Sequence, residues 1–106
     1  MEKARTIDGG DGHSYTVRRL GTGDVMRILR MGVALKDEDR FSMLSVMMSI
    51  DAIDGRPEPR AKDEETLIRL GDRVSDAMPR IAEACRDLNQ PLTPEVQAET
   101  TALAKN

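Results

Sequence analysis

The chain has 106 residues, with 16 lysines and arginines against 19 aspartates and glutamates, and a formal net charge of −3. This length fits one domain, or a small core with a tail. A content of 39% hydrophobic and 33% charged residues is too apolar for a disordered chain and too polar for a membrane protein. One cysteine and one histidine exclude an intramolecular disulfide and fall short of a structural zinc site. The negative charge and the 2% of aromatic residues argue against nucleic-acid binding.

The first predicted element is a β-hairpin over residues 4–20. Residues 4–7 and 14–18 contain β-branched or aromatic side chains, as strands do, and the connection between them holds three glycines. A two-stranded hairpin is marginally stable by itself. We therefore expect its apolar face, which carries Tyr15 and Val17, to pack on helices or on another chain.

Two apolar helices are predicted next, over about 23–35 and about 38–53, with Thr22 and Asp37 as their N-caps. The second has more than one apolar face, which is typical of a helix that is central in its domain or covered by a partner. Five of the seven methionines lie in these two helices, and methionine adapts to irregular partners. Core packing explains the same pattern, and both interpretations can hold. The predicted protein-binding surface consists of Val25, Ile28, Leu29, Met43, Met47, Ile50 and Ile53.

An exposed loop over residues 54–61 is predicted to follow, with Gly55 ending the second helix. Asp63 is predicted to cap a short helix over about 64–70.

The last clear helix is predicted over about 72–88, after a break at Gly71. Pro79 either kinks this helix or lies in the first turn of a helix that begins later, and the unbroken apolar period favours a kink. These elements predict one α+β domain over residues 1–90, mostly helical, in which an N-terminal β-hairpin precedes a small bundle of three to four helices. Residues 91–106 are predicted to form a tail, either a short helix or a disordered segment.

Residues with reactive side chains are sparse. His13 lies in a glycine-rich turn without a neighbouring nucleophile or further ligands, and Cys85 lies on the apolar stripe of the last helix. The acidic run 37–39 lacks the alternating ligands and the glycine of an EF-hand. We expect no catalytic residue, no metal site, no cofactor and no enzymatic activity.

Three segments carry a family resemblance. Residues 16–24 join a strand to a helix start with threonine and aspartate, residues 50–57 contain Asp-Gly and a proline, and residues 67–88 combine spaced leucines with a helix. Over residues 4–90 the chain resembles the small tail assembly chaperones of long-tailed bacteriophages. The resemblance implies a cytoplasmic protein of the host cell that binds the tape measure protein. It implies that this binding keeps the tape measure protein soluble until tail tube subunits polymerise around it.

The expected partner is therefore a protein, with the tape measure protein as the candidate. A second copy of the chain is a further candidate, because an exposed hairpin edge can add strands. We expect no membrane association and no nucleic-acid binding. The alternative is a small adaptor or regulatory protein, and one version of that alternative associates with DNA.

Overall fold

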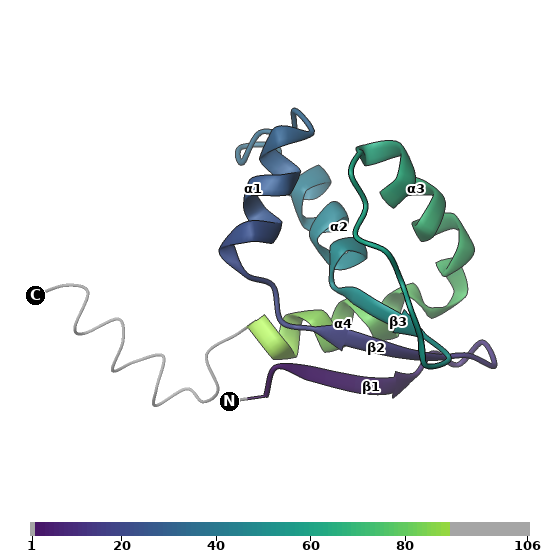
Figure 1. The fold of residues 1–106 in the computed structure, drawn as a ribbon. Coiled ribbons are helices and arrows are strands. Elements are labelled where there is room, and N and C mark those ends of the chain that lie inside the picture. Colours follow the sequence, from purple (N-terminus) through teal and green to yellow (C-terminus); the bar gives the residue numbers. More distant parts are fainter. Residues whose placement is uncertain (1, 90–106) are drawn as a thin grey trace, which may run out of the picture.

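The computed structural model describes residues 2–89, which form a four-stranded antiparallel sheet and a set of helices (Figure 1). The strands are β1 (Ala4–Asp8), β2 (Ser14–Arg18), β3 (Ile50–Ile53) and β4 (Arg56–Pro57). The helices are α1 (Thr22–Arg30), α2 (Glu38–Met48), α3 (Glu64–Arg73) and α4 (Met78–Asn89), with a 3-10 turn at Ser75–Ala77. The predicted α+β class and the N-terminal hairpin are confirmed. The predicted tail, 91–106, lies outside the described residues.

The hairpin packs on a helix, as its apolar face requires. Strands β1 and β2 pair in register from Ala4 opposite Arg18 to Asp8 opposite Ser14, and α4 packs against both strands. Tyr15 and Val17 are buried, and the Tyr15 hydroxyl donates to Asp11 at 2.6 Å. Helices α1, α2 and α3 gather on one side of these strands (Figure 1).

Helix α1 is shorter than predicted. Its N-cap is Gly21, one residue before the predicted cap, and its C-cap is Met31. Gly32 follows with a φ of 88°, in the left-handed region that glycine adopts without steric cost and that ends helices. Val33 is buried although it lies beyond the helix. The helical spacing of apolar residues continues to this position, and a prediction from that spacing therefore places the helix end too late.

The predicted helix over 38–53 is wrong in its last turn. Helix α2 ends at Met48, and residues 50–53 form β3, which pairs antiparallel with β2. Asp54 and Gly55 have φ angles of 52° and 78°, so the two residues connect β3 to β4 in a tight hairpin turn. Gly55 therefore belongs to the turn between two strands and, contrary to the prediction, does not end a helix. Residues 50–53 are not helical because their backbone groups form hydrogen bonds with β2.

Two predictions about the C-terminal helices also need correction. Helix α3 continues through Gly71, where an added Cβ would lie 3.2 Å from the Met47 sulfur, so glycine here permits close helix packing. Helix α4 begins at Met78, which places Pro79 in its first turn, where a missing N–H group leaves no helical hydrogen bond unmade. The kink interpretation is wrong. The predicted cap of α3 is confirmed, since Asp63 accepts from the Thr66 amide at 2.8 Å.

A buried ion pair joins the sheet to two helices. Asp24 is 4% exposed, and Arg18 donates to both of its carboxylate oxygens, at 2.7 and 2.6 Å. The same guanidinium donates to the Met48 carbonyl at 3.0 Å, and the Gly21 amide donates to Asp24 at 2.8 Å. The end of β2, the start of α1 and the end of α2 therefore meet at this ion pair.

Replacing this carboxylate is expected to destabilise the fold. The Arg18 guanidinium holds the pKa of Asp24 below its ordinary value of 3.8, so the stabilisation is present above about pH 4 and is lost as the pH falls through the folded pKa. We expect Asp24→Asn to lower the free energy of unfolding by about 3 kcal/mol at pH 7, because Arg18 stays buried without its anion. Urea denaturation measures this loss.

The matched control is Asp39→Asn at an exposed aspartate, for which we expect a change within about 0.5 kcal/mol. The deficit of the Asp24 variant should shrink as the pH falls below about 4 towards the folded pKa, because the native chain then loses stability by taking up a proton on Asp24 when it unfolds. A deficit that is independent of pH would contradict the assignment.

The two turns of the sheet are joined by His13 and Asp54. The imidazole Nδ1 lies 2.6 Å from the carboxylate, which also accepts from the Ser14 amide at 2.9 Å. The hydrogen bond that His13 donates to the Asp54 carboxylate raises the pKa of His13. The Ser14 amide and then His13 lower the pKa of Asp54. This pair stabilises the fold below about pH 6.5, and its contribution is lost as the pH rises through the folded pKa of His13.

His13 is the single histidine of the chain, so its titration can be followed by NMR without assignment. We expect a pKa above 6.5 in the native chain and a value close to 6.5 in Asp54→Asn. Asp39→Asn should leave the titration unchanged. A native pKa at or below 6.5 would show that the two turns do not pair in solution.

Candidate functional site

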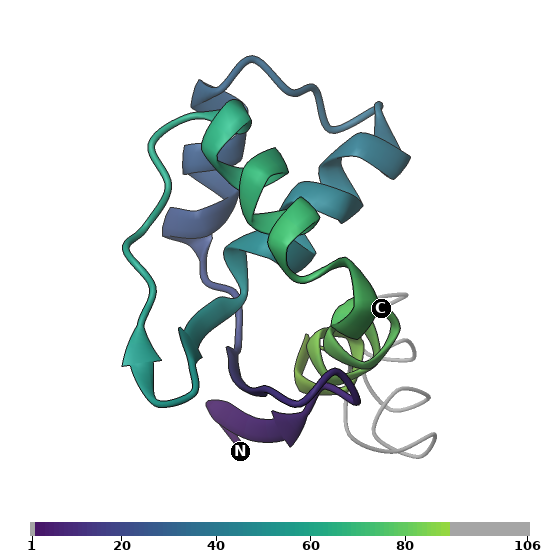
Figure 2. The same cartoon turned by 90° about the vertical axis from the view of Figure 1, so that its right-hand side faces the viewer.

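Helix α3 packs against α2 (Figure 2). Two openings border α3. The first, which we call the α2–α3 groove, has a volume of 310 Å³ and is lined by Met43, Leu44, Met47, Leu67, Ile68, Gly71, Asp72, Ser75 and Met78. The second lies between α3 and the connection that follows β4, and has a volume of 240 Å³. We call it the arginine-rimmed pocket.

The α2–α3 groove has exposed apolar walls above a buried floor. Met43 on α2 is 56% exposed and Ile68 on α3 is 52% exposed, whereas Met47 and Leu67 between them are almost fully buried. Asp72 is the one charged residue among those that line the groove. An apolar face that stays open between two helices can accept a third apolar helix face.

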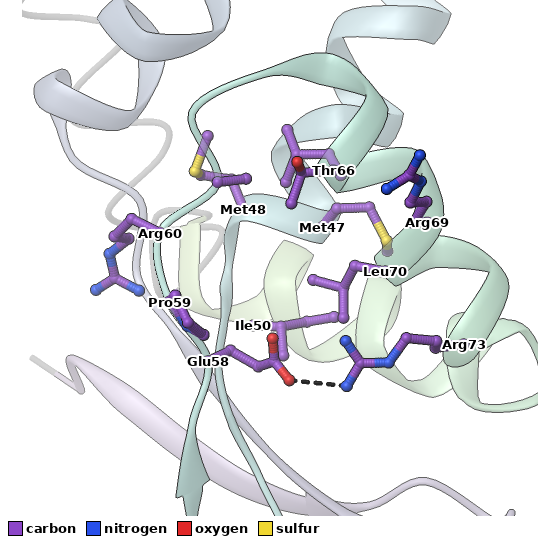
Figure 3. A pocket seen from close by; sticks show the side chains of 12 residues that line it. Met47, Met48, Ile50, Glu58, Pro59, Arg60, Thr66, Arg69, Leu70 and Arg73 are labelled. Carbon is purple, nitrogen blue, oxygen red and sulfur yellow. Dashed lines mark hydrogen bonds and ion pairs between the residues drawn. The ribbon is translucent and has the colours of Figure 1, made fainter.

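The arginine-rimmed pocket has an apolar floor and a charged rim (Figure 3). Met47, Ile50 and Leu70 reach into it from α2, β3 and α3. The charged lining residues are Glu58, Arg60, Arg69 and Arg73. Arg73 donates to Glu58 at 2.9 Å across the opening.

The seven residues of the predicted binding surface do not form one surface. Met47 lines both openings, Met43 lines the α2–α3 groove and Ile50 lines the arginine-rimmed pocket. The other four line neither opening: Val25, Ile28, Leu29 and Ile53. Three of the seven belong to the buried core, namely Ile28, Met47 and Ile50, and of the seven only Met43 is largely exposed.

Sequence reasoning missed the contribution of α3. Leu67, Ile68 and Gly71 of this helix line the groove, as does Met78 at the start of α4. A signal for Ile68 was present, because this residue lies outside the buried stripe formed by Leu67 and Leu70 on an otherwise amphipathic helix. Together with the exposed Met43 on the facing helix, Ile68 contributes to an apolar patch, and such a patch indicates an interaction surface.

The single cysteine of the chain is buried. Burial raises the pKa of the Cys85 thiol, which favours its unreactive protonated form. No group of three or more metal-ligating side chains comes together within residues 2–89. In the same residues, no helix has both the length and the apolar character needed to cross a bilayer.

Comparison with known proteins does not place the chain in a family: no family model, no curated protein and no solved structure matches it. The interpretation of the two openings therefore rests on their geometry and chemistry.

The two methionines of the groove should differ sharply in their effect on stability. We expect Met47→Ala to lower the free energy of unfolding by about 3 kcal/mol, because it leaves a cavity beneath α3. Met43→Ala should cost less than about 1 kcal/mol, because its side chain is mostly exposed. Urea denaturation measures both values. Equal losses would mean that α3 does not cover α2 as described.

Proposed function

We propose that the chain is a non-enzymatic tail assembly chaperone of a long-tailed bacteriophage. In this proposal an amphipathic helix of the tape measure protein binds in the α2–α3 groove and is kept soluble until the tail tube forms. The proposal places the protein in the host cytoplasm, where tails assemble. The family assignment depends on the resemblance of residues 16–24, 50–57 and 67–88.

One observation carries the binding site: Met43 and Ile68 remain more than half exposed on the two walls of a mostly apolar groove. The free energy of the system falls when a partner covers exposed apolar side chains and removes them from water. Methionine is unbranched and polarisable, and it contributes Met43, Met47 and Met78 to this lining. Such a surface suits a chaperone, which must accept several apolar segments of one long helical partner.

The test is co-expression of the chain with the tape measure protein encoded beside it. We expect the native chain to keep this protein in the soluble fraction and to co-purify with it. The double variant Met43→Asp, Ile68→Asp should reduce the co-purified amount by at least about tenfold, since two apolar contacts become desolvated charges. Both positions are exposed, so the variant should remain folded.

The matched control is Leu35→Asp. Leu35 is 60% exposed, and it lies in the connection between α1 and α2, outside the groove lining. We expect this variant to retain the partner. A tape measure protein that aggregates with the native chain present would reject the function, and equal loss in both variants would reject the groove as its site.

A further inference from the structure

We propose that the arginine-rimmed pocket is a second binding site, for a peptide segment that presents one apolar side chain flanked by carboxylates. This inference goes beyond the proposed function, because it concerns the other opening beside α3 and a ligand of different charge. It is based on the volume of the pocket, on its apolar floor, and on the exposure and hydrogen bonds of its arginines.

The size and the floor define the central group of the ligand. The volume of 240 Å³ is below the roughly 300 Å³ at which small-molecule and cofactor sites begin. Met47, Met48, Ile50, Leu67 and Leu70 line the inner part, and all five are buried. The space therefore suits a single apolar side chain that enters from a peptide lying across the opening.

The rim defines the flanking groups. Three arginines and one glutamate line the opening, and the carboxylates of Asp51 and Glu65 pair with two of these arginines from outside the lining. Arg60, Arg69 and Arg73 have side chains that are 40%, 74% and 61% exposed. Long exposed guanidiniums around an apolar hollow attract a carboxylate more than any neutral group.

Each of these arginines has donors to spare. Among the described residues, each makes one hydrogen bond to a carboxylate through one terminal nitrogen: Arg60 to Asp51 at 3.0 Å, Arg69 to Glu65 at 2.6 Å and Arg73 to Glu58 at 2.9 Å. A guanidinium carries five N–H groups. The unused donors can bind a second carboxylate without breaking the existing pairs.

The two openings differ in the charge that they select. Asp72 is the charged residue of the α2–α3 groove, so a segment rich in carboxylates is repelled there and attracted to the arginines on the other opening. Met47 and Leu67 form part of both floors, so the apolar contact is similar in the two places. Charge is therefore the property that distinguishes the ligands.

The experiment is an NMR titration of the full chain with the synthetic peptide acetyl-Glu-Glu-Leu-Glu-Glu-amide. We expect saturable shifts of the amide signals of Ala61, Thr66 and Arg69, with a Kd on the order of 1 mM or tighter. A peptide with lysine in place of glutamate should not bind. A peptide with serine in place of leucine should bind at least about fivefold more weakly, because the apolar floor stays empty.

The variant Arg69→Gln, Arg73→Gln should weaken binding at least about tenfold, because it removes two charge-assisted contacts. Arg86→Gln is the matched control, because Arg86 is exposed on α4 and outside the pocket lining. It should leave the Kd unchanged. The amide spectra of both variants report whether the fold is retained.

Equal binding of the lysine peptide, an unchanged Kd in the double variant, or shifts centred on Met43 and Ile68 would overturn the proposal. Tighter binding of decanoate than of the peptide would overturn the assignment to a peptide and indicate a fatty acid. The titration contains no tape measure protein. Its failure would leave the co-expression result intact, and failure of the co-expression test would leave this site intact.

Discussion

The fold depends on the ion pair between Arg18 and Asp24. Removing two charges from water is costly and is offset only when nearly every polar atom finds a partner. Asp24 meets this condition, since both of its oxygens accept from Arg18 and one also accepts from the Gly21 amide. Arg18 meets it incompletely: its Nε is buried without a hydrogen-bond partner within residues 2–89, and the nearest carboxylate oxygen, on Asp51, is 3.9 Å away. The pair therefore fixes the position of three elements more than it adds net stability.

This junction also explains where α2 ends. The guanidinium of Arg18 donates to the Met48 carbonyl, and the Arg18 amide donates to the Ser49 carbonyl at 2.8 Å. These two carbonyl groups at the end of α2 are therefore bound by a residue of β2. The chain then continues as β3 beside that strand. Apolar spacing could not reveal this, because Met47 and Ile50 keep a helical interval across the boundary. The Asp-Gly pair at residues 54–55 was the available signal, since that pair favours a two-residue hairpin turn.

The hairpin, the class of fold and the Asp63 cap could be predicted because each depends on residues close in sequence. The binding surface could not, because it depends on where α3 crosses α2. Met43 and Met47 lie one helical turn apart on the same stripe, yet one is 56% exposed and the other 2%. The difference arises because Gly71 lets α3 approach Met47. An apolar stripe on one helix predicts that another element covers it. Which turn of the helix is covered depends on where the neighbouring helix packs.

The crossing of α3 has a consequence for selectivity. A single wide apolar face would attract apolar segments of any charge, which favours aggregation. Helix α3 covers the centre of that face and presents Asp72 to one opening and Arg69 and Arg73 to the other. In the two proposed sites the apolar floor would supply similar attraction, while the flanking charge would penalise the wrong ligand at each. One amphipathic helix, placed across its neighbour, therefore divides an apolar face into two openings that are lined by different charges.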